Sequence, residues 1–311
     1  MNGAPIFYAR TALTLSLTIC FAIAQSVFAQ HKSYQKPKYE YVYSAGLSIY
    51  FGDLAGASIG ATTIPLYPDS DLSHARSMVL FGIRKNISHR LALRGSLSAT
   101  TLFADERNSA SSIRAERNLH FRTSIQELSG LVEYNLINFA KNKNNFILEY
   151  YVFGGLGLFH FNPKAKYKDE WVRLQPLGTE GQGVKPGLKK YRTVAFSFPI
   201  GAGLRANLNQ EWTIFGELSF RATATDYLDD VSTVYYEYNK IYQAHGRTAA
   251  DLSYRGNEVS YPTNVPRGNP ESKDSYASLT LGVSKMFGSK RVKSTWQTKA
   301  TQSQTDNCPR F

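Results

Sequence analysis

Eight segments of the chain alternate apolar with polar residues, and the gaps that separate them alternate between long and short. The segments are Tyr41–Phe51, Ser77–Lys85, Arg90–Leu102, Leu119–Tyr134, Phe146–Phe161, Thr193–Leu208, Trp212–Thr223 and Ser275–Phe287. The gaps hold about 25, 4, 16, 11, 31, 3 and 51 residues. Short periplasmic turns alternate with long outward loops in this order in bacterial outer-membrane barrels. The sequence therefore predicts an all-β fold, an eight-stranded antiparallel transmembrane β-barrel.

The alternation within single segments is typical of a wall that meets lipid on one face. Between Val194 and Leu208, apolar residues occupy every second position, and small or polar residues such as Gly203 and Arg205 occupy the others. Such runs reach the roughly 9–11 residues that a tilted strand needs to cross a bilayer. Closure of the sheet would leave no unpaired strand edge in lipid.

The segment Leu119–Tyr134 is the weakest of the eight, because its apolar residues also fit helical spacing. As a strand it requires a change of phase: Phe121, Thr123 and Ile125 face outward first, and Leu128, Gly130, Val132 and Tyr134 face outward afterwards. That change implies a β-bulge near Gln126–Glu127. We favour the strand, because a helix here would leave seven strands and break the alternation of loop lengths.

Both ends of the chain differ from the barrel segments. Arg10, an apolar run over 12–24 and Ala29 predict a secretory signal peptide at 1–29. A lipoprotein signal ending at Cys20 is the alternative. We expect a periplasmic segment at 30–40, the barrel at 41–287, and a basic disordered tail at 288–311, or alternatively a docking peptide there that uses Trp296. Only Cys308 would remain after cleavage, which excludes an intramolecular disulfide.

The charge of the chain bears on its partners. The 36 Lys and Arg residues outnumber the 24 Asp and Glu residues, and removal of Arg10 with the signal peptide leaves 35 − 24 = +11. A basic surface attracts acidic groups, so we expect contact with outer-membrane lipid and with lipopolysaccharide phosphates, or with acidic partner proteins. Nucleic acid is not an expected partner of an exported chain.

The polar faces of the segments place charges of both signs inside the barrel. An eight-stranded barrel is just wide enough for its own side chains to fill it, so we predict a plug of paired charges. A gate that opens by exchange of ion-pair partners is the alternative. Inward glycines at Gly155, Gly157, Gly201 and Gly203 would make room for larger side chains. The predicted lumen charges are Arg84, Arg94, Arg122, Glu127, Glu133, Glu149, Arg205, Glu217 and Arg221.

No local motif indicates catalysis. The six histidines are scattered without metal-ligand spacing, and the glycines of the segment Gly201–Ala206 continue a strand instead of opening a nucleotide-binding helix. An outer-membrane enzyme would need a triad assembled from distant residues. The carboxylates of Asp226, Asp229 and Asp230 could bind calcium, but we favour a structural role in which they accept hydrogen bonds from loop backbone or arginines. We expect no enzymatic activity, no cofactor and no metal.

Four short motifs occur in order along the chain: Tyr50–Leu54, Phe161–Pro163, Leu177–Gly183 and Asp226–Ser232. Together they resemble the PorG-like outer-membrane barrel family, which includes a component of the type IX secretion system. The likeness spans most of the chain from Tyr43 to Phe287. Its loop motifs contain Thr179, Glu180, Gly181, Gln182, Gly183, Asp226, Tyr227, Asp229 and Asp230.

The resemblance implies a non-enzymatic barrel that anchors a periplasmic ring, built from a lipoprotein called PorK and its partner PorN, to the outer membrane. It implies that ring contacts lie on the periplasmic side, at 30–38, 86–89, 135–145, 209–211 and the tail after Phe287.

The alternative is a surface-binding barrel whose long loops at 52–76, 162–192 and 224–274 recognise a ligand or a neighbouring envelope protein. The last of these loops is rich in tyrosine, which supplies contact area at interfaces.

Overall fold

The computed structural model describes residues 39–55, 72–107, 112–139, 148–209, 211–256 and 262–287. The expected signal peptide, most of the expected N-terminal segment, and the C-terminal tail with Trp296 and Cys308 lie outside these residues, as do residues 140–147. The first strand begins at Tyr39, two residues before the predicted start.

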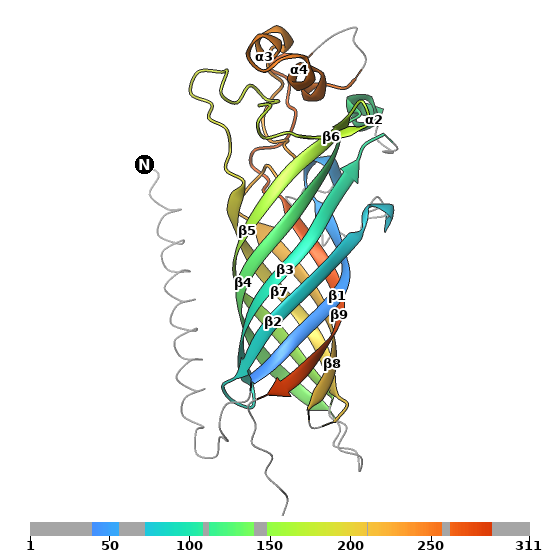
Figure 1. Cartoon of the computed structure of the whole chain (residues 1–311), viewed down its shortest axis with the longest axis vertical. Coiled ribbons are helices and arrows are strands. Elements are labelled where there is room, and N and C mark those ends of the chain that lie inside the picture. The colour runs from blue at the N-terminus through green and yellow to red at the C-terminus, as the bar shows by residue number, and fades with distance from the viewer. Residues whose placement is uncertain are drawn as a thin grey trace, which may run out of the picture.

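Eight long strands form a closed antiparallel barrel (Figure 1). Each strand pairs with its neighbours along the chain, and the last pairs with the first to close the wall. The predicted fold class is therefore confirmed, and the segment predicted at Leu119–Tyr134 lies in a strand from His120 onward. The strands are β1 (Tyr39–Phe51), β2 (Arg76–Asn86), β3 (Leu91–Asp105), β4 (His120–Phe139), β5 (Leu148–Tyr167), β7 (Val194–Asn207), β8 (Trp212–Thr223) and β9 (Ser275–Phe287).

The two ends of the barrel differ, and we call them the loop end and the turn end. Short connections join the strands at the turn end. At the loop end β4 and β5 extend beyond their neighbours (Figure 1), and β5 forms a hairpin with the short strand β6 (Glu170–Arg173). The loop-end segments contain α2 (Ser112–Arg117), α3 (Tyr238–His245), α4 (Arg247–Ser253) and the 3-10 turns η1 (Asp53–Ala55) and η2 (Leu72–His74). Within the described ranges, no helix has the length and apolar character needed to span a membrane.

The outer face of the wall carries a continuous belt of exposed apolar side chains. Leu281 is 72% exposed and Leu218 is 62% exposed. A belt of this kind on a folded chain is explained by contact with lipid, because water would penalise so large an apolar area. Its members include Val79, Phe81, Leu97, Leu128, Val132, Leu156, Leu158, Phe196, Phe198, Ile200, Leu204, Ile214, Leu218, Leu279, Leu281 and Val283.

The predicted bulge at Gln126–Glu127 is wrong. The registers of β4 with β3 and with β5 run without interruption through Gln126, and the register shift of β4 lies between Asn135 and Ile137. Phe121 and Ile125 point inward and are buried, in phase with Glu127. The pattern misled because the interior changes character along the barrel, from charged near its middle to apolar near the loop end.

Candidate functional site

The lower part of the lumen is filled by a connected network of buried ion pairs centred on Glu133. Its carboxylate lies 2.9 Å from Nε of Arg84, 3.0 Å from Nε of Arg94 and 2.7 Å from Nη2 of Arg205. These side chains come from β2, β3, β4 and β7, so the network connects walls that face each other across the barrel. One carboxylate therefore holds three guanidinium groups, which only further acids can balance.

Two more glutamates balance these arginines. Glu40 lies 2.8 Å from Nη1 of Arg84 and also accepts hydrogen bonds from Asn86 and Ser284. Glu217 lies 2.5 Å from Nη1 of Arg94 and accepts a 2.6 Å hydrogen bond from Oη of Tyr151.

Glu127 and Arg221 form a separate buried ion pair nearer the loop end. The Glu127 carboxylate lies 3.1 Å from Nε of Arg221 and accepts hydrogen bonds from Ser197 and Tyr276. The buried ion pairs of the lumen therefore involve four arginines and four glutamates.

The structure places most predicted lumen charges together, with two differences. Arg122 is wrong as a lumen residue: it is exposed on the outer face, where its guanidinium lies 5.7 Å from the Trp171 ring centroid. Its inward assignment came from the incorrect phase of β4. Glu149 lies at the margin, 3.9 Å from Arg205. Glu40 was missed, although extending the alternation of Val42 and Ser44 by one step would have found it.

Inward glycines admit the bulky partners of the network. A Cβ atom at Gly203 would lie 2.5 Å from the ring of Tyr151, and one at Gly201 would lie 2.4 Å from the ring of Phe153. Both distances are below any normal contact, so these positions accept no larger side chain unless the rings move.

An apolar and aromatic cluster closes the lumen above the charges. Phe121, Phe159, Phe161 and Tyr276 are almost fully buried there and pack with Leu228 and Val231 of the long loop between β8 and β9. The loop thus inserts apolar residues into the barrel mouth. The lumen is filled by side chains from the ion-pair network to this cluster.

Above the cluster, two loop carboxylates converge on one hydroxyl. Oη of Tyr50 lies 2.7 Å from Oδ2 of Asp229 and 2.5 Å from Oδ1 of Asp274. A hydroxyl has one proton to donate, so one of these close contacts needs a proton on a carboxyl group. Burial raises the pKa of both Asp229 and Asp274 well above the ordinary aspartate value, which favours that protonated form.

Glu180 connects the loop after β6 to the loop after β8. Its carboxylate accepts hydrogen bonds from the backbone amides of Ser232 and Thr233 and from Oγ1 of Thr233. It also pairs with Nη1 of buried Arg267 at 3.1 Å. The same Arg267 nitrogen donates to the backbone carbonyl of Asp230 at 2.6 Å.

Asp230 and Asp226 complete this second network. Oγ1 of Thr179 and Oη of Tyr191 each donate to the Asp230 carboxylate at 2.5 Å, and Oγ of Ser232 donates to Asp226 at 2.6 Å. Burial raises the pKa of Asp230 to about 6 and that of Asp226 to about 7. We call the set Tyr50, Thr179, Glu180, Tyr191, Asp226, Asp229, Asp230, Ser232, Arg267 and Asp274 the cap network.

The remaining motif residues surround the cap network. Gln182 accepts a hydrogen bond from the backbone amide of Glu180, and Tyr227 stacks on Tyr191 with ring centroids 4.4 Å apart. Gly181 has φ +82°, and a Cβ there would lie 2.6 Å from the ring of Tyr236. Gly183 also has φ +82°. The four motifs noted in the sequence thus meet at the loop end, because Tyr50 binds Asp229 and Phe161 stacks on Tyr191.

This arrangement joins the loops to one another through hydrogen bonds and ion pairs. Among the described residues, no group of three or more His, Cys, Asp or Glu side chains is arranged to hold a metal ion. Asp229 accepts hydrogen bonds from the backbone amides of Leu54 and Val231, as expected for a structural carboxylate. Sequence reasoning missed Arg267, Asp274 and Tyr191, which lie outside the four motifs.

A polar cavity of about 660 Å³ lies beside α3 and α4 at the loop end. Tyr167 and Tyr238 both donate hydrogen bonds to the carboxylate of Asp251, each at 2.7 Å. The volume of the cavity falls in the range of roughly 300–1,000 Å³ that is typical of small-ligand sites. Its lining residues are Asn118, Tyr167, Tyr238, Asn239, Asp251, Tyr254, Arg255 and Gly256.

Comparison with solved structures returns small outer-membrane barrels. Neisserial surface protein A matches with a TM-score of 0.39 and 7% identity, covering 81% of this chain and all of its own. The N-terminal barrel of Pseudomonas aeruginosa OprF matches with a TM-score of 0.32 and 12% identity, covering 80% of this chain and 97% of its own. Yersinia pestis Ail, in complex with sucrose octasulfate, matches with a TM-score of 0.33 and 10% identity, covering 81% of this chain and 97% of its own. At these TM-scores the likenesses carry no argument about function.

No curated protein matches the chain. The sequence profile of one family matches residues 73–244, more than half of the chain and a range that contains both loop motifs. The protein therefore belongs to the family described as Domain of unknown function (DUF6089).

Proposed function

We propose that the protein is a non-enzymatic outer-membrane barrel that serves as an anchor subunit of a protein-secretion complex resembling type IX. The observation that carries this proposal is the filled lumen: paired charges and an aromatic cluster occupy the interior, so the barrel acts through its surfaces and not as a conduit. The apolar belt supports residence in a membrane, and we infer the outer membrane from the closed barrel and the expected signal peptide.

The resemblance to PorG-like barrels supplies the partner class. The motifs that carry it form one hydrogen-bonded cap at the loop end, which supports a fold with a rigid outward end. The turn end is then the face available to a periplasmic ring resembling PorK and PorN. Among the described turn residues, Arg90 and Glu211 are exposed charges at that face.

Affinity isolation of a tagged copy from outer membranes in mild detergent tests the anchor proposal. We expect the ring lipoprotein and its periplasmic partner to be recovered at near-stoichiometric levels. The double variant Arg90→Glu, Glu211→Lys should reduce that recovery. The matched variant Lys189→Glu, Glu237→Lys alters exposed charges at the loop end and should leave it unchanged. Isolation of the folded barrel alone would refute the anchor role.

A surface-binding barrel is the second candidate, and the tyrosine-lined cavity beside α3 and α4 favours it. Aromatic faces with a carboxylate and amides between them suit a polar ligand such as a glycan or a segment of a neighbouring envelope protein. Tyr254→Ala should abolish binding of a glycan selected from an array by the purified protein. Val265→Ala shortens an apolar side chain that is 49% exposed outside the cavity and should have no effect. Equal binding by both variants would exclude the cavity.

A further inference from the structure

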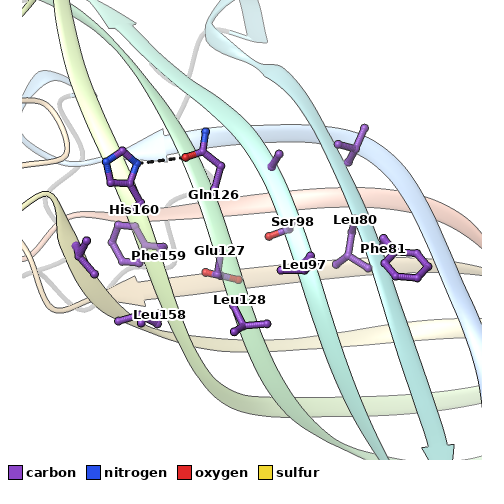
Figure 2. A pocket seen from close by; sticks show the side chains of 13 residues that line it. Leu80, Phe81, Leu97, Ser98, Gln126, Glu127, Leu128, Leu158, Phe159 and His160 are labelled. Atoms are coloured by element: carbon purple, nitrogen blue, oxygen red, sulfur yellow. Dashed lines mark hydrogen bonds between the residues drawn. The ribbon is translucent and has the colours of Figure 1, made fainter.

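The outer wall carries a furrow of about 660 Å³ across β2, β3, β4 and β5 (Figure 2). It lies within the apolar belt, and most of the outward side chains that border it are aliphatic or aromatic. A furrow in a lipid-facing wall accepts an acyl chain with apolar contact on both sides. Its outward-facing lining residues are Val79, Phe81, Leu97, Ala99, Gln126, Leu128, Leu158, His160 and Val194.

Small residues give the furrow its depth and extend it. Ala99 lies between Val79 and Gln126 on the neighbouring strands. Further toward the turn end Gly95 pairs directly with Gly130, and each has open space where a Cβ would stand. The outer surface of the wall is therefore recessed along this line, and larger side chains at these positions would fill the furrow.

A polar pair marks the rim of the furrow. Nδ1 of His160 lies 3.2 Å from Oε1 of Gln126, within hydrogen-bond distance, and Figure 2 shows the two side chains next to each other above Leu128 and Leu158. The two residues are directly paired between β4 and β5. The apolar belt thus ends on these strands at this pair.

Beyond the rim the same outward face becomes cationic. Arg122 of β4 pairs with Lys164 of β5, which pairs with Arg173 of β6, and paired antiparallel residues point to the same face of a sheet. The three form a row across neighbouring strands, four residues along β4 and β5 from Gln126 and His160, which is two outward-facing pairs. Each step of two residues advances roughly 7 Å along a strand, so tilted strands place the row about 10 Å above the rim.

Neighbouring acids do not neutralise this row. No ion pair joins Arg122, Lys164 or Arg173 to a carboxylate among the described residues. Nε of Arg173 donates to the Asn162 side chain at 3.1 Å, and Arg122 lies over the ring of Trp171. Acids that flank the row have other cationic partners: Asp169 pairs with Lys166, and Asp105 pairs with Arg107.

We propose that the furrow and the cation row together bind one phosphorylated glycolipid of the outer leaflet, with an acyl chain in the furrow and a phosphate at Arg122, Lys164 and Arg173. Arginine and lysine hold phosphate by charge-assisted hydrogen bonds, and their long side chains reach from strand to headgroup. An aromatic residue at this level, Trp171, suits the membrane interface. The site goes beyond the anchor function and does not depend on it.

Binding of lipid A to the full-length barrel in neutral phosphatidylcholine nanodiscs tests the site. Arg122→Gln, Lys164→Gln, Arg173→Gln should lower the affinity at least roughly tenfold, since each basic residue near an anionic surface contributes measurably. The matched triple variant Lys185→Gln, Lys189→Gln, Lys240→Gln removes equal charge elsewhere at the loop end and should change affinity less than about twofold. Equal losses in both variants would overturn the proposal.

A second pair of measurements separates headgroup from chain. Dephosphorylated lipid A should bind the unmodified protein and the Arg122 triple variant equally weakly. Ala99→Phe fills the furrow, keeps every charge and should also weaken binding of lipid A. Full affinity in a folded Ala99→Phe variant would exclude the furrow. Displacement of lipid A by millimolar inorganic phosphate would reduce the site to a general anion site and refute recognition of a lipid.

Discussion

The ion-pair network in the lumen and the cap network at the loop end are both buried and polar, but they balance charge differently. In the lumen, four arginines meet four glutamates directly. In the cap, Glu180 is the one carboxylate of the network that forms an ion pair with buried Arg267, and hydroxyl and backbone amide groups donate hydrogen bonds to Asp226, Asp229, Asp230 and Asp274. Strands on opposite sides of the lumen can place oppositely charged side chains against each other, whereas loops supply backbone amides that donate hydrogen bonds to carboxylates.

Because of this difference, we expect the lumen network and the cap network to respond differently to mutation and to pH. A network of full ion pairs fails when one member is removed, because the partner is left buried without a counter-charge. A network of carboxylates with few cations depends on bound protons and on single donors. We therefore expect mutations in the lumen to affect the whole barrel, and changes in the cap to affect the loops alone.

Glu133→Gln should have the largest effect. The substitution leaves Arg84, Arg94 and Arg205 around a neutral amide, and loss of one partner from a buried ion pair costs on the order of 3–5 kcal/mol. The free energy of unfolding in detergent, followed by heat-modifiable gel mobility in urea, measures it. Glu149→Gln, at the margin of the same network, is the control and should cost less than about 1 kcal/mol. Similar losses in the two variants would contradict a network centred on Glu133.

Glu180→Gln should have a smaller, local effect. It removes the charge that faces buried Arg267 and weakens acceptance from Ser232 and Thr233, at a cost on the order of 1–3 kcal/mol. Hydrogen exchange should rise at 179–183 and 230–234 while strand protection stays unchanged. Glu237→Gln, which alters an exposed ion pair with Lys240, is the control. Exchange that rises in the strands as well would show that the cap and the barrel unfold together.

A rise in pH should loosen the cap. The pKa of Asp230 is raised from 3.8 to about 6 and that of Asp226 from 3.8 to about 7. Between pH 3.8 and these raised values, the folded cap therefore binds more protons than the unfolded loops do. The resulting stabilisation is complete below about pH 4 and is lost as the pH rises through 6 to 7. Protease cleavage of the loops should therefore be slower at pH 5 than at pH 8.

Asp226→Asn provides the check on this pH dependence. The amide cannot titrate, so the change in cleavage between pH 5 and pH 8 should shrink, with the protease calibrated at each pH on an unfolded peptide. A full pH response in the variant would show that Asp226 does not contribute.

Much of the fold could be predicted from the sequence, because the alternation of apolar and polar residues follows directly from a wall with lipid outside. The strand limits near Trp212, Thr223, Ser275 and Phe287 were correct for this reason. The phase of β4 was wrong because Phe121 and Ile125 are apolar yet face inward, into the cluster beneath the cap. Alternation shows which residues share a face, but not whether an apolar face contacts lipid or the interior.

The site was less accessible to sequence reasoning for a similar reason. The positions of the lumen charges follow from the phase of each strand, so most of them could be predicted. The prediction for Arg122 was wrong because the predicted phase of that part of β4 was wrong. The cap partners Arg267, Asp274 and Tyr191 could not be paired with Glu180, Asp229 and Asp230, because the paths of long loops are not encoded in a short repeat. The outward cation row also depends on the register between neighbouring strands, which cannot be read from the sequence of one chain.

The smallest effect expected is that of Tyr191→Phe, and it is the most specific. The substitution keeps the aromatic stacking on Phe161 and Tyr227 but removes the hydroxyl that donates to Asp230 at 2.5 Å. That donor stabilises the charged carboxylate, so its loss should raise the pKa of Asp230 further and cost about 1 kcal/mol when Asp230 is ionised. The loops of the variant should therefore be cleaved faster than those of the unmodified protein at pH 8, where Asp230 is ionised, and at nearly the same rate at pH 5. Tyr242→Phe, which removes an exposed hydroxyl outside the cap network, should leave cleavage unchanged at both pH values. Equal cleavage of Tyr191→Phe and the unmodified protein at pH 8 would mean that the Tyr191 hydroxyl does not stabilise ionised Asp230.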